Sequence, residues 1–81
     1  MESTAEDVKR YIAEGLDCEL LQVEGDGRHF SALIVARAFE GKSRVQRHQL
    51  VYAALGERMR EQVHALSMRT LTPAEYAQEP R

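Results

Sequence analysis

Three histidines and one cysteine are the candidates for metal binding or proton transfer in this sequence: His29, His48, His64 and Cys18. His64 follows the polar stretch "ERMREQV" and opens the alternating run "HALSMRTL", so we expect it at the start of a strand. Ser67 lies three residues further on, but spacing alone gives no support to a Ser-His-acid site. The other interpretation of His64 is structural, as a histidine that is hydrogen-bonded at the end of a strand.

No motif typical of an enzyme is present. The sequence has no Gly-rich phosphate loop, no Cys-x-x-Cys pair and no His-Glu-x-x-His run. A chain of 81 residues also buries only about 60% of the surface of its unfolded state, so a deep catalytic pocket would take up much of its core. We therefore expect a surface-acting module and not an enzyme.

The cysteine content and the N-terminus favour a cytoplasmic protein. Cys18 is the only cysteine, so it has no partner for an intramolecular disulfide, which suits a reducing compartment. The first residues, "MESTAEDVKR", are acidic and lack the apolar segment of a signal peptide. No apolar run approaches the roughly 20 residues that cross a bilayer. We expect no association with membranes.

Charge is distributed unevenly along the chain, although the net charge is only −2. Residues 1–26 carry eight acidic residues against two basic ones, whereas residues 27–60 carry seven basic residues against two acidic ones. Such asymmetry permits a basic face that meets nucleic acid or an acidic partner protein. It is equally typical of faces that are simply solvated.

The hydrophobic pattern predicts the element order α-β-β-α-α-β-α in a single domain over residues 1–81. "STAEDVKRYIAEGL" predicts a first helix that begins with a near capping box between Thr4 and Asp7. "CELLQVEGDGRHFSALIVARAF" then predicts two strands around a Gly-Asp-Gly turn. Alternate residues of the second strand are expected on one buried face: Phe30, Ala32, Ile34 and Ala36.

The second half of the chain contains two more helical segments before a third strand. "RVQRHQLVYAAL" predicts a helix with Val45, Tyr52 and Leu55 on one apolar stripe, ended by Gly56 and followed by a short helical piece around "ERMRE". We expect Phe30, Phe39, Tyr52 and Leu55 in the core.

The C-terminal segment carries a strong signal for a last helix. "HALSMRTL" predicts the third strand, and the "TPAE" that follows predicts the helix start. In this start Thr72 is the N-cap, Pro73 is the first helical residue and Glu75 reaches back to the cap.

Two separated stretches resemble the BolA family, in particular its short-loop, IbaG-like branch. They are "GDGRHFSALIVARAFEGKSRVQRHQLVYAAL" and "VHALSMRTLTPAEY", and the likeness covers nearly the whole chain. The resemblance implies a small α/β (α+β) domain similar to the type II KH domain, with helices on one face of a three-stranded mixed sheet. The predicted element order agrees with this fold.

The resemblance also implies a partner and a cofactor. BolA proteins form complexes with monothiol glutaredoxins and share a [2Fe–2S] cluster, whose other ligands are a glutaredoxin cysteine and glutathione. The family's ligand is the histidine that opens the last strand, which corresponds to His64. Imidazole in place of thiolate removes negative charge and raises the potential of such a cluster. The implied role is iron–sulfur cluster assembly, trafficking or iron sensing.

The second ligand on this chain is left open by the sequence. Many relatives carry a histidine or cysteine in a longer loop between the first two strands, whereas the turn here is only "EGDGRH". His29 or Asp26 could therefore approach the cluster, or His29 could simply cap the turn. Cys18 precedes the first strand, and we expect it to be a small buried apolar residue.

Arg47 and His48, in the predicted helix over residues 44–55, each have two interpretations. Arg47 either pairs with a nearby acid or carbonyl or faces a partner, and His48 is either half-buried beside Tyr52 or part of the same partner surface. With Lys42 and Arg44 they form a candidate surface for a partner or for nucleic acid. Arg58 and Arg60 could extend this surface as further contacts to phosphate. A DNA-binding transcriptional regulator is thus the alternative function, although the Gly-x-x-Gly loop of KH domains is missing.

Overall fold

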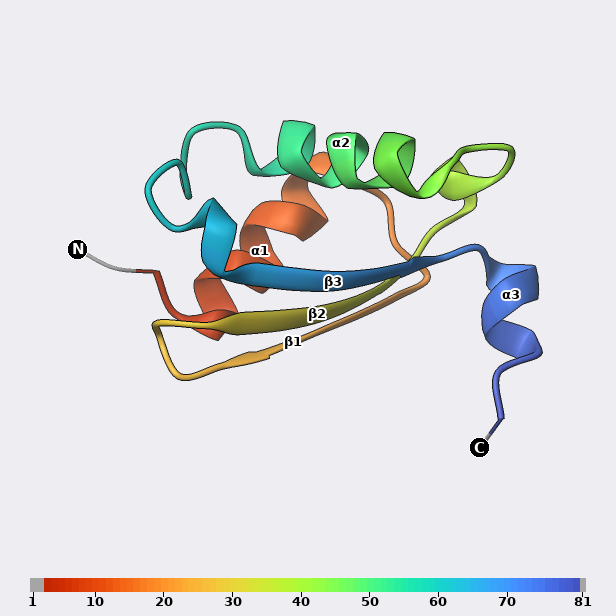
Figure 1. Cartoon of the computed structure of the whole chain (residues 1–81), viewed down its shortest axis with the longest axis horizontal. Coiled ribbons are helices and arrows are strands. Elements are labelled where there is room, and N and C mark those ends of the chain that lie inside the picture. The colour runs from red at the N-terminus through yellow and green to blue at the C-terminus, as the bar shows by residue number, and fades with distance from the viewer. Residues whose placement is uncertain (1–2, 81) are drawn as a thin grey trace.

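A three-stranded sheet with two helices packed on one of its faces forms the body of the molecule (Figure 1). The computed structural model describes residues 3–80. The strands lie in the order β1-β2-β3, with β1 antiparallel to β2 and β3 parallel to β2, which is the predicted mixed sheet. Their bounds are Leu20–Gly25 (β1), Phe30–Val35 (β2) and Leu66–Leu71 (β3).

The helices follow the predicted order, except that no helix forms at residues 57–61. The α-helices are Ala5–Gly15 (α1), Arg44–Leu55 (α2) and Pro73–Ala77 (α3), and short 3-10 helices lie at Arg37–Phe39 (η1) and Val63–Ala65 (η2). Helices α1 and α2 cover the same face of the sheet, whereas α3 lies at the end of β3 (Figure 1). No helix in the described range is long and apolar enough to span a bilayer.

The core lies between the sheet and these two helices. Alternate residues of β2 point toward the helices and are buried, as predicted, because side chains of a strand alternate between its faces: Phe30, Ala32 and Ile34. Helix α1 adds Val8 and Ile12, which are four residues apart and therefore share a face. Phe39 and Leu55 are also buried, as expected.

The predicted apolar stripe of α2 is wrong at two of its three positions. Val45 is 66% exposed and Tyr52 is 42% exposed, so Tyr52 is not a core residue. The helix instead buries Val51 and Leu55, four residues apart. Val45 and Tyr52 are seven residues apart and share another face, which the sheet does not cover.

The short helix expected around residues 57–61 is also wrong, because this segment forms a series of turns. Gly56 ends α2 with a φ of 60°, a left-handed conformation that favours glycine. The N–H groups of Arg58, Arg60 and Gln62 then donate to carbonyls three residues earlier, not four. Met59 is the one apolar residue within 57–61, and a helix here would have no apolar face to bury.

Candidate metal-ligand site and the basic surface of α2

His29 and His64 lie at the same end of the sheet. The first residue of β2, Phe30, is paired with the first residue of β3, Leu66. His29 directly precedes Phe30, and His64 lies two residues before Leu66. Because β2 and β3 run parallel, the segments that lead into them meet at one end. Both imidazoles are on exposed residues there.

Gln62 links the two segments that carry these histidines. Its Nε2 donates to the carbonyl of Gly27 in the β1–β2 turn at 3.4 Å. Its Oε1 accepts from the backbone N–H of Ser3 at 3.1 Å. The two contacts join residues that are 35 and 59 positions apart, so no local sequence pattern indicates them. The chain before η2 is thereby fixed against the turn that presents His29.

Asp26 holds the β1–β2 turn. Its Oδ1 accepts from the backbone N–H groups of Arg28 at 2.8 Å and His29 at 2.9 Å. These hydrogen bonds, the one from His29 first, keep the pKa of the Asp26 carboxyl below its usual value. The Asp26 side chain therefore has a structural role in the turn. The other candidate for the second ligand, His29, takes part in these hydrogen bonds only through its backbone, and its side chain is exposed.

Gly25 allows the turn to close. A Cβ at this position would lie 2.5 Å from the carbonyl oxygen of His29 and 2.6 Å from Cδ1 of Phe30. Both distances are below van der Waals contact, so any other residue displaces the backbone beside His29. The short turn thus depends on glycine at the point where β1 ends.

The sequence predicted that His64 opens β3. In the structure it lies in η2, just before the strand. The N–H of Ala65 donates to the Gln62 carbonyl at 2.9 Å, and the N–H of Leu66 donates to the Val63 carbonyl. These bonds turn the chain before it enters the sheet. The backbone of His64 is therefore held while its side chain faces solvent.

Cys18 lies away from the two histidines. It precedes β1, whose first residue pairs with Val35 at the far end of β2. Its Sγ is 3.4 Å from the Leu16 carbonyl oxygen, and burial raises the pKa of the thiol. The side chain is half-buried against the core, close to the apolar role expected for it.

The histidine end supplies few ligands by itself. Within residues 3–80 no group of three or more His, Cys, Asp or Glu side chains could hold a metal ion. At this end the described residues therefore offer the imidazoles of His29 and His64 as candidate ligands.

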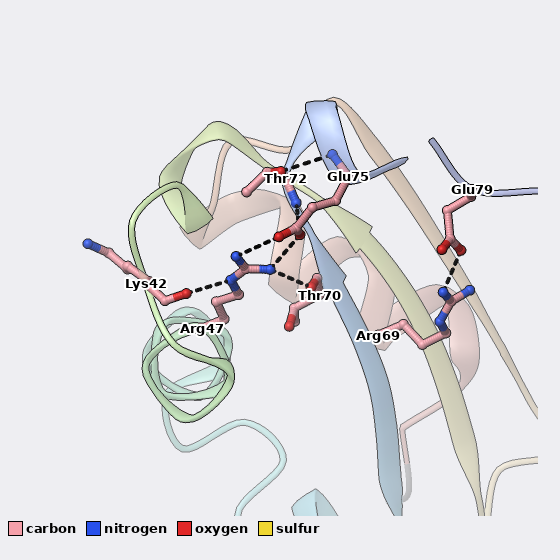
Figure 2. Close-up of polar contacts among 7 residues, drawn as sticks. All are labelled: Lys42, Arg47, Arg69, Thr70, Thr72, Glu75 and Glu79. Atoms are coloured by element: carbon pink, nitrogen blue, oxygen red, sulfur yellow. Dashed lines mark hydrogen bonds and ion pairs between the residues drawn. The ribbon is translucent and has the colours of Figure 1, made fainter. Parts of the chain in front are cut away.

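Arg47 is used inside the fold, in agreement with the structural interpretation of this residue (Figure 2). Its side chain is only 13% exposed and forms a two-pronged ion pair with Glu75, with N–O distances of 2.7 and 3.1 Å. Its Nε donates to the Lys42 carbonyl and its Nη1 to the Thr70 carbonyl, both at 3.0 Å. Arg47 therefore joins α2 to the end of β3 and to the start of α3.

The capping box of α3 is part of the same network. The Thr72 side chain accepts from the Glu75 N–H at 3.1 Å, and the Glu75 carboxylate accepts from the Thr72 N–H at 2.9 Å. The Arg47 guanidinium, together with this N–H, lowers the pKa of Glu75 to about 2. The predicted helix start is confirmed, and the arginine that completes it was not foreseen.

The other members of the predicted basic surface differ in exposure. Lys42 and Arg44 are exposed, and neither forms an ion pair in the described part of the chain. His48 is half-buried, and its Nε2 is buried without a hydrogen bond to any described group of the protein. Burial, and then the charge of Arg44, lower the pKa of His48. Of the four residues Lys42, Arg44, Arg47 and His48, it is Lys42 and Arg44 that present a charge to solvent without an ion pair to another described residue.

The chain forms a small α+β domain with a single layer of mixed sheet and two helices on one face. Its candidate metal ligands, His29 and His64, lie at the surface. The family model described as BolA-like protein matches residues 8–75. The chain belongs to the BolA family.

Similar proteins cover nearly the whole chain. Acid stress protein IbaG of Escherichia coli K12 is 35% identical, over 90% of this chain and 88% of that protein. Human BolA-like protein 2 is 37% identical, over 98% of this chain and 96% of that protein. The solved structure of a bolA homologue from Coxiella burnetii matches with a TM-score of 0.83 and 44% identity, covering 94% of this chain and 99% of that one.

Proposed function

We propose that this protein is the partner of a monothiol glutaredoxin and shares a [2Fe–2S] cluster with it through His64. The observation that carries the proposal is the position of two exposed imidazoles at one end of the sheet, on segments linked by Gln62. The protein would act, without catalysing a reaction, in iron–sulfur cluster assembly, trafficking or iron sensing.

The donor set of this end suits a shared cluster. A [2Fe–2S] cluster takes four ligands, and His64 with His29 supplies at most two. A glutaredoxin cysteine and glutathione would supply the others. The cluster, when bound, provides an iron–sulfur unit whose potential is raised by imidazole ligation. His64 presents its ring from a short turn whose backbone is hydrogen-bonded on both sides, so the ligand is positioned before the partner arrives.

His29 is proposed as the second ligand on this chain. The hydrogen bonds of Asp26 to the backbone hold the turn and leave the His29 ring exposed. Because the turn is closed by Gly25 and is short, its reach toward a cluster is limited. His29 would therefore contribute less to cluster binding than His64.

The alternative, a DNA-binding regulator, is left with fewer residues than the sequence indicated. Arg47, Arg58 and Arg60 form ion pairs, with Glu75, Glu14 and Glu57 in turn. Of the predicted cations, Lys42 and Arg44 are exposed and have no ion pair in the described range. Phosphate contacts dominate affinity for DNA, so the pairing of three of the five cations weakens the case for DNA binding.

The experiment that tests the proposal is to mix the purified protein with a cluster-loaded monothiol glutaredoxin and glutathione, and to record visible absorption and circular dichroism. We expect a new spectrum that belongs to a complex of the two proteins. His29→Ala should weaken or shift this spectrum, whereas Cys18→Ser should leave it unchanged. His48→Ala is the matched histidine control and should keep its spectral character.

Two results would contradict the proposal. One is a glutaredoxin spectrum that does not change when this protein is added. The other is a salt-sensitive complex with DNA in place of the complex with glutaredoxin. Far-ultraviolet circular dichroism of each variant separates the loss of a ligand from the loss of the fold.

A further inference from the structure

Three segments of the chain meet at the histidine end of the sheet: the chain that enters α1, the β1–β2 turn and the chain that enters η2 (Figure 1). Gln62, the residue directly before η2, contacts both of the other segments. Its Nε2 donates to the Gly27 carbonyl at 3.4 Å, and its Oε1 accepts from the backbone N–H of Ser3 at 3.1 Å. Gln62 is half-buried and Ser3 is buried, so the carboxamide lies within the junction of the three segments.

The orientation of this carboxamide follows from its two partners. A backbone carbonyl accepts hydrogen bonds and a backbone N–H donates them, so Nε2 faces Gly27 and Oε1 faces Ser3. A carboxylate at this position would satisfy the N–H of Ser3 but could not donate to Gly27. An apolar side chain would satisfy neither group. Both contacts together therefore require a carboxamide.

Gln62 also begins the turn that carries His64. Its backbone carbonyl accepts from the N–H of Ala65 at 2.9 Å, and His64 lies inside this turn. On the neighbouring segment, Gly27 precedes His29 by two residues. Gln62 thus connects the turn of His64, through its backbone, to the turn of His29, through its side chain.

The sheet itself does not hold the two histidines. The pairing of β2 with β3 begins at Phe30 and Leu66, so His29 and His64 both precede the paired residues. Two ligands on separate segments bind one centre well only when their separation is fixed beforehand, because ordering them on binding costs free energy. The contact of Gln62 with the β1–β2 turn restrains that separation outside the sheet.

We propose that Gln62 is a positioning residue, which sets the separation of the His29 and His64 imidazoles before a partner binds. It acts through the backbones of the two turns and not as a ligand. The inference rests on the function proposed above for what the two imidazoles bind, whereas the restraint itself is a property of the free protein.

The restraint is tested first in the free protein, by 15N relaxation of the backbone amides in the full chain. In Gln62→Ala we expect the amides of residues 27–29 and of His64 to become more mobile on the picosecond to nanosecond timescale. Gln62→Glu keeps the acceptor for Ser3 and loses the donor to the turn, so it should release residues 27–29 while the Ser3 amide stays ordered. Gln49→Ala removes an exposed glutamine of α2 and is the control. Unchanged order in both Gln62 variants would overturn the proposal.

The second measurement titrates the protein against a cluster-loaded monothiol glutaredoxin and follows visible circular dichroism. Gln62→Ala should raise the dissociation constant of the mixed complex by about two- to tenfold, as expected for the loss of one neutral hydrogen bond. In a His29→Ala background the same substitution should have a smaller effect, because a single imidazole leaves no separation to set. Equal effects in the two backgrounds, or no effect in either, would contradict the role of Gln62.

The two measurements also distinguish this proposal from the function on which it rests. If the unaltered protein forms no mixed complex, the proposed function fails, and the relaxation data still decide whether Gln62 restrains the two turns. The amide signals of Ile34 and Thr70, which are paired between β2 and β3, show whether each variant keeps the sheet.

Discussion

Thr4 and Thr72 show how far single residues could be predicted from the sequence. Each accepts a hydrogen bond from an N–H three residues later, and the residue at that position returns a bond to the cap. Both partners lie within four residues of sequence, so the pattern alone predicts them. Gln62 contacts residues 35 and 59 positions away, and no pattern of that kind exists for it.

Thr72→Ala should lower the free energy of unfolding by about 1 kcal/mol, because the Glu75 N–H loses its acceptor. Urea unfolding of the variant measures the change. Thr72→Ser keeps the accepting oxygen and serves as the control, with a smaller loss. An unfolding midpoint for Thr72→Ala equal to that of the unaltered protein would show that this cap does not stabilise α3.

At the scale of elements, the most extensive connection is the one that Arg47 makes between α2, β3 and α3. Arg47 and Glu75 are 28 residues apart, and the sequence left open whether Arg47 pairs with a nearby acid or carbonyl or faces a partner. Two of the wrong predictions, the stripe of α2 and the helix at 57–61, have a related cause. Which face of a helix is covered, and whether a short polar segment remains helical, depend on tertiary packing.

The ion pair of Arg47 with Glu75 predicts a dependence of stability on pH. The pKa of Glu75 is about 2 in the folded protein, against an ordinary value of 4.5. The unfolded state therefore binds a proton first as the pH falls. The contribution of Glu75 is complete above its ordinary pKa and is lost as the pH falls from there toward 2.

Urea unfolding at a series of pH values measures this effect. The Glu75→Gln variant should show a smaller slope of unfolding free energy against pH in the acidic range than the unaltered protein. Glu40→Gln removes an exposed carboxylate outside the network and is the matched control. An identical slope in Glu75→Gln and in the unaltered protein would contradict the role assigned to this pair.

For the whole molecule, the fold brings the acidic and basic parts of the sequence together. Arg58 binds Glu14 and lies over the Tyr11 ring at 4.4 Å, so it joins α1 to the end of α2. Arg37 pairs with Glu19 at 3.0 Å. The charge asymmetry seen in the sequence is therefore partly a set of internal contacts. Composition could not reveal this, because it gives charges without their partners.

The two ends of the sheet differ in what they present to other molecules. One end carries His29 and His64 on exposed segments, and the other carries Cys18 and the end of β3 with its network. The identity of His64 as a candidate ligand came from the sequence and its family resemblance. Its place beside His29 follows from the parallel pairing of β2 with β3, which requires the three-dimensional structure.

The central claim is that His64 binds the shared cluster, and pulsed electron paramagnetic resonance tests it most directly. The measurement uses the reduced complex of the 15N-labelled protein with unlabelled glutaredoxin and glutathione. We predict a 15N coupling typical of a metal-bound imidazole, retained in His48→Ala. In a folded His64→Ala protein the complex with this coupling should be lost, leaving the glutaredoxin's own cluster. A folded His64→Ala protein that still forms the complex with an unchanged 15N coupling would contradict the account.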